Sequence, residues 1–242
     1  LPVTSLLTGE SGSGKEVLAR EIHRQSGRAP FVAVNCGAIP EALLESELFG
    51  AVKGAFTGAT HDRKGLFEEA HEGTLLLDEV ADLPPLLQVK LNRALEDGEI
   101  RRAGESRTRR VDVRVLAATH RDLDAMVAEG SFRLDLLYRL RAFSLHLPPL
   151  RERIEDLPVL CARFLHMAAA RYGTAASRIT PDALAALERA PWPGNVRELK
   201  HAMERAAVMS AAETIDVAEL PEGLLQLAPP ARAGTYREAV DR

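Results

Sequence analysis

The sequence predicts an α/β protein in which helices flank a parallel sheet, followed by a small all-helical lid domain. Over the first 147 residues, apolar positions alternate between strand-like and helix-like periodicity. One run, Thr74-Leu75-Leu76-Leu77, is continuously apolar, as in a strand whose two faces are both covered by helices. After Pro148-Pro149 the strand patterns stop and long helical patterns follow. These observations favour a parallel-sheet core with a separate helical lid.

The elements of the first domain are expected to alternate along the chain. Short apolar runs predict strands at 5–8, 31–35, 74–77, 113–117 and 144–147. Apolar spacings of i, i+3 and i+4 predict helices at 16–25, 42–48, 86–96, 123–128 and 133–139. In the lid, helices are predicted at 156–172, 181–190 and 195–209. Thr180-Pro181 and Pro193-Gly194-Asn195 are the start signals of the last two.

The domain boundaries follow from these changes in pattern. Residues 1–147 are predicted to form the α/β domain, and residues 148–225 the helical lid. Residues 226–242 are predicted to be a linker and the start of a truncated helix. Because the chain opens almost inside its first predicted strand, we expect it to be a fragment of a longer protein.

Composition limits the function classes. The 242 residues carry 31 Lys+Arg and 35 Asp+Glu, a net charge of −4, which argues against nonspecific nucleic-acid binding through bulk positive charge. Cys36 and Cys161 form no C-x-x-C pair, so neither a disulfide framework nor a zinc site is indicated. No apolar run is long enough to cross a bilayer. A reducing, cytoplasmic location with no membrane partner is therefore expected.

A glycine-rich segment between the first predicted strand and the first predicted helix has the pattern of a P-loop. It reads Gly9-Glu10-Ser11-Gly12-Ser13-Gly14-Lys15-Glu16. Backbone N–H groups and the helix N-terminus of such a loop bind phosphate oxygens, and Lys15 would neutralise the β- and γ-phosphates. The last position, usually a Ser or Thr that binds magnesium, is Glu16. The alternative is an ordinary glycine-rich turn between a strand and a helix.

Two adjacent carboxylates, Asp78 and Glu79, follow the apolar run at 74–77. Ligands of parallel α/β sheets bind at the C-terminal ends of the strands. There Asp78 would bind Mg²⁺, usually through water, and Glu79 would orient the attacking water of a phosphoryl transfer. Without the P-loop, an apolar run followed by two acids would equally fit a strand whose end is capped by solvated carboxylates. Together with the P-loop it predicts a nucleotide-hydrolysing site.

A third segment sets one phenylalanine among small residues. It reads Lys53-Gly54-Ala55-Phe56-Thr57-Gly58-Ala59, and its composition is that of a loop that can move. On its residues alone, a hairpin that buries Phe56 in the core is the better interpretation.

Taken together, these motifs resemble the central AAA+ domain of the sigma-54-dependent transcription activators, the bacterial enhancer-binding proteins. The hexapeptide from Gly54 to Ala59 is the hallmark of that family, whose P-loop also carries Glu at the position of Glu16. The resemblance extends over residues 1 to about 224. Other similar segments are Asn35-Cys36, Glu47-Leu48-Phe49-Gly50, Ala117-Ala118-Thr119, Phe132-Arg133-Leu134-Asp135, Leu147-Pro148-Pro149-Leu150-Arg151 and Trp192-Pro193-Gly194-Asn195-Val196-Arg197.

The resemblance implies roles for single residues. Asn35 resembles the residue that holds the catalytic glutamate, here Glu79, away from water until nucleotide and target are sensed. Thr119 resembles the sensor of the γ-phosphate. The segment Gly54, Ala55, Phe56, Thr57, Gly58 and Ala59 would contact sigma-54.

Three arginines also receive roles from the resemblance. Arg133 and Arg139 resemble arginine fingers that enter the site of a neighbouring subunit and stabilise the transition-state charge. Their six-residue spacing puts them on no common helical face, so one or both can serve the intersubunit contact instead. Arg197 resembles a lid arginine that reaches the nucleotide phosphates. Without the resemblance, Arg133 and Arg139 would be interpreted as solvated surface arginines, and Arg197 could equally be a surface charge at a helix N-terminus.

A basic stretch at 101–114 is interleaved with Glu99, Glu105 and Asp112. The family carries a second loop near residues 103–110 that supports the hexapeptide loop. A DNA-contacting hairpin is the alternative, but mixed charge favours a solvated or intersubunit face. Two features depart from the family. Ala51-Val52 replaces a His-Glu pair, and Asn92 replaces an apolar residue. The change at Asn92 is expected to loosen local packing.

The resemblance implies a ring-forming, magnesium-dependent ATPase that remodels the sigma-54 RNA polymerase holoenzyme and converts closed promoter complexes into open ones. A hexamer is the expected active state and a dimer an inactive one. Enhancer DNA would be bound only through a domain absent from this chain. The alternatives are another P-loop ring ATPase, which would lack the hexapeptide, and a scaffold that binds ATP without turnover.

Overall fold

The computed structural model describes residues 3–56, 59–221 and 224. It divides into two compact units, Leu1–Leu147 and Pro148–Arg242, which are described separately below. Thr57, Gly58 and the predicted linker and truncated helix at 226–242 lie outside the described residues. Among the described helices, none has the length and apolar character that a membrane span requires.

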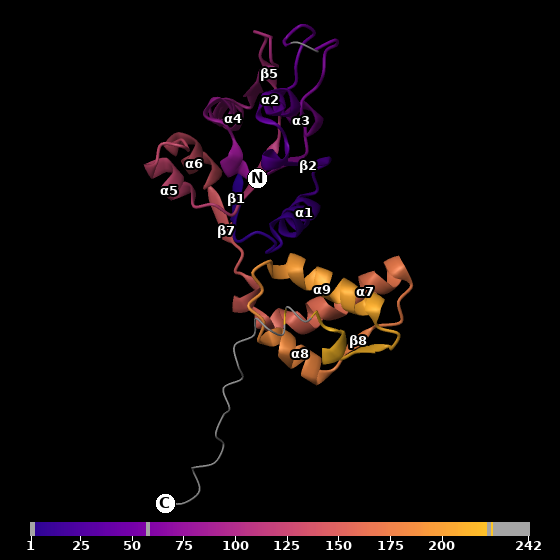
Figure 1. Cartoon of the computed structure of the whole chain (residues 1–242). Helices are drawn as coiled ribbons and strands as arrows, with labels where there is room; N and C mark the ends of the chain where they lie inside the picture. Colours follow the sequence, from indigo (N-terminus) through magenta and orange to yellow (C-terminus); the bar gives the residue numbers. More distant parts are fainter. Residues whose placement is uncertain (1–2, 57–58, 222–223, 225–242) are drawn as a thin grey trace, which may run out of the picture. The chain divides into compact units, whose positions relative to one another are not determined.

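A five-stranded parallel sheet forms the centre of the first unit (Figure 1). Its strand order is β2-β3-β6-β1-β7, so the first strand of the chain lies inside the sheet. The predicted parallel sheet is confirmed, with strand ends shifted by one or two residues. The strands are β1 (Ser5–Thr8), β2 (Phe31–Asn35), β3 (Thr74–Asp78), β6 (Arg114–Thr119) and β7 (Phe143–His146).

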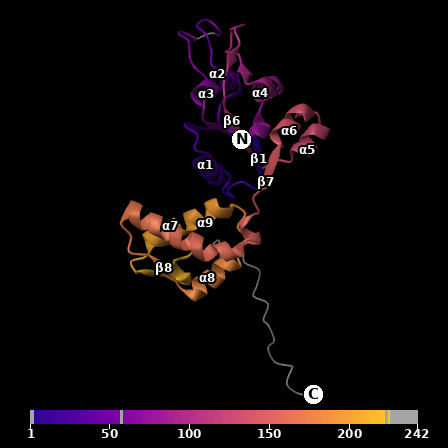
Figure 2. The same cartoon turned by 180° about the vertical axis from the view of Figure 1, so that it is seen from behind.

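Both faces of the sheet are covered, which explains the continuous apolar run in β3. Leu76 packs with Ala19 of α1 on one face, whereas Leu75 and Leu77 belong to the larger core on the other face. All three leucines are fully buried. In both views α1 lies on one side of the sheet and α4, α5 and α6 on the other (Figures 1 and 2). The helices are α1 (Lys15–Ser26), α2 (Glu41–Phe49), α3 (Leu66–Glu69), α4 (Pro85–Asp97), α5 (Leu123–Ala128) and α6 (Leu134–Leu140).

Several short elements of this unit lie where the sequence predicted none. Single 3-10 turns, η1 (Cys36–Ala38) and η2 (Val80–Asp82), follow β2 and β3 directly. A short antiparallel hairpin pairs β4 (Glu99–Ile100) with β5 (Arg109–Arg110). The tip of this hairpin and the segment that contains Phe56 project together, at the end of the unit opposite to the P-loop (Figures 1 and 2).

The described residues of the second unit form three helices of the following bounds: α7 (Leu157–Tyr172), α8 (Pro181–Glu188) and α9 (Asn195–Met209). Trp192 is fully buried between them, and its indole N–H donates to the Leu187 carbonyl at 2.9 Å. Thr180 caps α8 by accepting from the Ala183 N–H, which agrees with its role as a start signal. A two-residue parallel pair, β8 (Arg178–Ile179) with β9 (Thr214–Ile215), was not predicted. Turns η3 (Leu150–Glu152), η4 (Ile154–Asp156) and η5 (Val217–Glu219) complete the unit.

Replacing Asn92 of α4 with leucine is predicted to stabilise the protein. The side-chain oxygen of Asn92 is buried and finds no hydrogen-bond partner among the described residues. Because a buried unsatisfied polar group costs about 1–3 kcal/mol, Asn92→Leu should raise Tm by several degrees in a thermal melt. Arg93→Asn at the exposed neighbouring position is the control, since it measures the helix-propensity cost of asparagine alone. If the rise in Tm caused by Asn92→Leu were no larger than the fall in Tm caused by Arg93→Asn, helix propensity alone would explain it. The buried side-chain oxygen of Asn92 would then carry no measurable cost.

Candidate nucleotide site and loop surface

The strand order brings polar residues from four strands to one edge of the sheet. In the parallel registers, Asn35 of β2 lies beside Asp78 of β3, and Thr8 of β1 lies beside Thr119 of β6. Between them, Asp78 lies beside Ala118 of β6. This is the C-terminal edge of the sheet, where ligands of open α/β folds bind. The P-loop leaves the same edge, because it directly follows β1.

The P-loop segment connects β1 to α1 through backbone that only glycine adopts readily. Gly12 and Gly14 have φ values of 77° and 108°. Lys15 begins α1 and is 6% exposed, with its ammonium group donating to the carbonyls of Gly9 at 2.8 Å and Glu10 at 3.1 Å. The lysine charge is therefore held against the loop backbone. Glu16, at the usual Ser/Thr position, makes an exposed ion pair with Arg20.

Asp78 is the half-buried carboxylate at the end of β3. Burial raises its pKa above the usual value, and the neighbouring Glu79 charge adds to that rise, whereas the Lys15 charge opposes it. Its Oδ1 accepts from the Glu79 N–H at 3.1 Å. The Lys15 ammonium thus acts electrostatically on Asp78 and favours its ionised form.

Glu79 is bound to a residue that sequence reasoning did not single out. Its Oε2 lies 2.8 Å from Nδ1 of His120 and accepts from the His120 backbone N–H at 3.4 Å. Asn35, the residue expected to hold Glu79, instead accepts from the Ala38 N–H and caps η1. His120 directly follows Thr119, so the signal available in the sequence was its place just after a predicted strand; the structure adds that this strand, β6, neighbours β3.

Two further groups complete this edge. Thr119 is fully buried, and its hydroxyl oxygen accepts from the Arg121 N–H at 3.0 Å. Burial raises the pKa of the Cys36 thiol to about 12, and the charges of Asp78, Asp82 and Glu79 add to this rise. Cys36 is therefore a protonated thiol at neutral pH and not a nucleophile.

The predicted finger arginines lie on the surface around α4 and α6. Arg133 precedes α6 and pairs with Asp135 at 2.8 Å, and Arg139 in the last turn of α6 pairs with Glu96 at 2.6 Å. In the described part of the chain, no hydrogen bond or ion pair joins either arginine to the P-loop. Arg197 lies in the first turn of α9, in the second unit, and is exposed.

The two described ends of the hexapeptide, 54–56 and Ala59, are joined by hydrogen bonds and are called the hexapeptide turn below; Phe56 in it lies at the surface. The Gly54 N–H donates to the Ala59 carbonyl at 2.9 Å, and the Ala59 N–H donates to the Phe56 carbonyl at 3.0 Å. Phe56 is 43% exposed, so the expectation from the residues alone that it packs into the core is wrong.

The base of this turn is fixed by the β4–β5 hairpin. The Val52 N–H donates to the Ala103 carbonyl at 3.1 Å, and a Cβ on Gly104 would lie 2.7 Å from the Cβ of Ala55. Arg102, 8% exposed, makes two hydrogen bonds of 2.7 and 2.9 Å to Glu68 of α3. The hairpin therefore contacts the hexapeptide turn, at the position predicted for a supporting loop.

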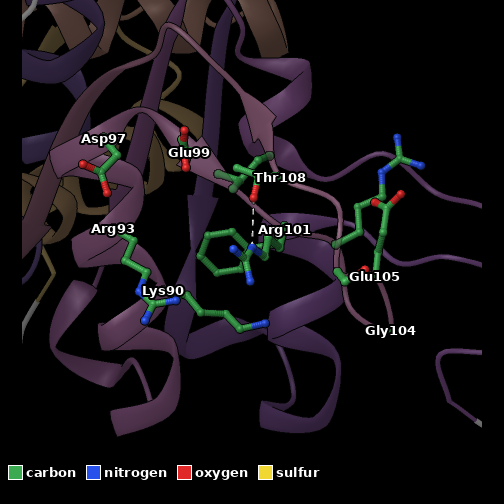
Figure 3. Close-up of a pocket in the computed structure, with 12 residues that line it drawn as sticks. Lys90, Arg93, Asp97, Glu99, Arg101, Gly104, Glu105 and Thr108 are labelled. Carbon is green, nitrogen blue, oxygen red and sulfur yellow. Dashed lines mark hydrogen bonds between the residues drawn. The ribbon is translucent and has the colours of Figure 1, made fainter.

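A cavity of about 690 Å³ lies between α4 and this hairpin (Figure 3). Its rim mixes charges, with Lys90, Arg93 and Arg101 facing acids such as Asp97 and Glu99. On the hairpin, Arg109 pairs with Glu105 and Arg110 pairs with Glu99. Three arginines of this stretch, Arg102, Arg109 and Arg110, are thus matched by acids, which disfavours a DNA-contacting surface.

The fold and this edge define a P-loop nucleotide-binding protein of the α/β class. Comparison with protein families identifies it further: residues 1–146 match the sigma-54 interaction domain, and residues 151–236 match the AAA+ ATPase lid domain. The chain therefore belongs to the sigma-54 interaction domain family, as the hexapeptide predicted.

Individual proteins agree with this assignment. The chain is 51% identical over 236 residues to the regulatory protein AtoC of Escherichia coli, covering 97% of this chain and 51% of that protein. It is 48% identical to the transcriptional regulator NtrC of Klebsiella pneumoniae, covering 94% of this chain and 49% of NtrC. The chain thus spans about half the length of these relatives.

Solved structures of NtrX from Brucella abortus share the fold. The structure of NtrX in complex with ATP superposes with a TM-score of 0.86 at 38% identity, covering 98% of this chain and 53% of that one. The complex of NtrX with ADP gives the same TM-score.

Replacing Lys15 with alanine is predicted to weaken ATP binding about 10- to 100-fold, because a hydrogen bond to a charged group contributes about 1.5–3 kcal/mol. Titration with a fluorescent ATP analogue measures this loss. Lys64→Ala removes an exposed lysine of the same unit and should leave the affinity unchanged. Equal affinities of wild type and Lys15→Ala in the presence of magnesium would remove Lys15 from the phosphate site.

Proposed function

We propose that the chain is a magnesium-dependent ATPase that engages sigma-54 through its exposed hexapeptide turn and drives the holoenzyme from the closed to the open promoter complex. The observation that carries this proposal is the pairing, in one unit, of a P-loop and acidic strand edge with a projecting turn that presents Phe56. Residues 1–147 would be the nucleotide-binding domain and residues 148–225 the lid, acting in the cytoplasm.

The residues at the strand edge fit a nucleotide with magnesium. Mg²⁺ prefers oxygen ligands and is usually held by one or two carboxylates plus substrate phosphates. Asp78 supplies such a carboxylate beside the Lys15 charge. Among the described residues, no group of three His, Cys, Asp or Glu side chains forms a metal site by itself. The ion would therefore enter with the phosphates and offset their charge, while Lys15 and the loop N–H groups orient them.

Within this site, Glu79 would hold the attacking water and accept its proton. The water oxygen would bond to the γ-phosphorus while the bond from that phosphorus to the β–γ bridging oxygen breaks and ADP leaves. Thr119, buried at the end of β6, would sense the γ-phosphate, and Arg197 of the lid would contact the phosphates.

A line of contacts leads from Glu79 toward the hexapeptide. Glu79 precedes η2, and η2 is packed so closely on η1 that a Cβ on Gly37 would lie 2.5 Å from Asp82 Oδ2. From η1 the chain runs through α2 into the turn that bears Phe56. A displacement at Glu79 can thus reach Phe56 through short rigid elements, which supports a coupling of hydrolysis to loop movement.

The surface arginines support a ring oligomer, with a hexamer as the active state and a dimer as an inactive one. Arg133 and Arg139 are preorganised at the surface by Asp135 and Glu96. An arginine inserted from a neighbouring subunit would stabilise the charge that develops on the transferred phosphoryl group.

ATP turnover per subunit is predicted to rise with protein concentration, because the site is completed only in the oligomer. Mixing Arg133→Ala or Arg139→Ala with Lys15→Ala should restore part of the activity, since each subunit supplies what the other lacks. Steady-state ATPase assays over a dilution series measure both effects. Turnover that is independent of concentration, with no recovery on mixing, would contradict shared sites.

Phe56→Ala is predicted to hydrolyse ATP at nearly the wild-type rate and to lose most of its affinity for sigma-54. Phe56 offers a large apolar face at low side-chain entropy cost, as binding hot spots do. A gel shift with sigma-54, in the presence of ADP and a metal fluoride, measures the affinity of each variant for sigma-54.

The control for this experiment is Phe143→Ala, which removes another half-exposed phenylalanine of the same unit. It should leave sigma-54 binding unchanged. If Phe56→Ala bound sigma-54 as tightly as wild type, the hexapeptide would not be the contact surface.

Gly104→Ala is predicted to weaken sigma-54 binding about tenfold while ATP hydrolysis continues, because its Cβ would collide with Ala55 and displace the turn. Gly130→Ala is the matched control: both glycines have a φ of 76°, but a Cβ on Gly130 meets nothing within 4 Å. Both variants thus carry the same backbone strain. Equal sigma-54 binding by the two variants would show that the hairpin does not support the turn.

A further inference from the structure

We propose that His120 is the positioning residue that holds Glu79 on the phosphate side of the site. The inference rests on the proposed ATPase function and extends it to a residue outside the set assigned above. It starts from the contact between the His120 imidazole and the Glu79 carboxylate, at 2.8 Å between Nδ1 and Oε2.

The order of the strands gives this contact its direction. β3, which ends next to Glu79, has β2 on one side and β6 on the other, and β6 is itself the neighbour of β1. Because the P-loop follows β1, the phosphates would lie on the β6 side of Glu79. Asn35 lies on the opposite side, at the end of β2. A Glu79 side chain bound to His120 is therefore turned toward the phosphates, and one bound to Asn35 would be turned away.

The hydrogen bonds fix one oxygen of the carboxylate and leave the other for water. Oε2 faces both the imidazole Nδ1 and the backbone N–H of His120, at 2.8 and 3.4 Å. Because an ionised carboxylate can only accept, a hydrogen bond between these atoms requires a proton on Nδ1, which donates the hydrogen bond to Oε2. No polar contact in the described part of the chain engages Oε1. Oε1 can thus accept a hydrogen bond from the attacking water while Oε2 is held.

A second contact joins the same two segments. Arg121, directly after His120, forms a 2.9 Å ion pair with Asp82 of η2, the turn that follows Glu79. The segment after β6 therefore holds the segment after β3 at two points. Glu79 itself has a positive φ of 53°, which is unusual for a residue with a side chain and sets the direction in which that side chain leaves the backbone. Thr119 directly precedes His120. A shift of Thr119 on contact with the γ-phosphate would therefore move His120, and with it the Glu79 side chain.

The kinetic test uses variants of the full chain at a protein concentration that saturates oligomer formation. His120→Leu should lower kcat for ATP by about 10- to 100-fold, the range expected when a catalytic group is misplaced, with KM changed by less than about twofold. His120→Asn, whose amide N–H can reach the position of Nδ1, should recover most of kcat. His166→Leu removes an exposed histidine of α7 and is the control for general effects of the substitution.

A measurement without turnover tests the same contact. Nitrogen chemical shifts of ¹⁵N-histidine-labelled protein above pH 8, where an ordinary imidazole is neutral, report which nitrogen carries the proton. His120 should be in the Nδ1–H form in wild type and shift toward the Nε2–H form in Glu79→Ala. Thermal melts and ADP affinity equal to wild type show that each variant is folded.

The outcomes separate this inference from the proposed function. Wild-type turnover that Glu79→Gln abolishes, together with an unchanged kcat in His120→Leu, would overturn the role of His120 alone. A higher kcat in His120→Leu would also overturn it, because His120 would then restrain Glu79. Turnover that survives Glu79→Gln would contradict the proposed role of Glu79, and the imidazole tautomer would still decide whether His120 holds its carboxylate.

Discussion

The parallel strand order β2-β3-β6-β1 is the constraint on which the rest of the structure depends. It places the ends of four strands side by side, so Asn35, Asp78, Thr119 and the start of the P-loop share one edge although they are far apart in the sequence. Both faces of β3 and β6 are buried under helices, so moving either strand to the edge of the sheet would expose apolar side chains on both faces. The chemistry proposed for this edge therefore relies on the most buried part of the unit.

The hexapeptide turn follows a different physical rule. Its base is hydrogen-bonded to the hairpin, and the ion pair of Arg102 with Glu68 holds the hairpin to α3, while Phe56 stays half exposed. A large apolar side chain left in water at the tip of a fixed turn is available for a partner. The base of the turn contacts the hairpin, whereas Phe56 is not part of the core.

Sequence reasoning predicted the elements that local pattern determines. The apolar run of β3 and the glycines of the P-loop carry their own signals, because a doubly covered strand and a phosphate-binding turn each require particular residue types. The contact between Glu79 and His120 could not be predicted in this way, since it depends on β6 being the neighbour of β3. A hairpin in the basic stretch was considered as an alternative, but its strands at 99–100 and 109–110 and the lid strands at 178–179 and 214–215 were not predicted, because two-residue strands have no measurable periodicity. For Phe56, local composition favoured burial, and only the family resemblance indicated exposure.

The most direct test of a coupling between the strand edge and the hexapeptide is the distance between a spin label beside the turn and one on α1, measured by pulsed electron paramagnetic resonance. Lys53→Cys and Val17→Cys provide exposed labelling positions, while the native Cys36 and Cys161 are buried. Dilution with unlabelled protein restricts the signal to single subunits. Coupling predicts that the distance distribution differs between the ADP state and the state with ADP and a metal fluoride. Identical distributions in the two states, with both nucleotides shown to be bound, would contradict it.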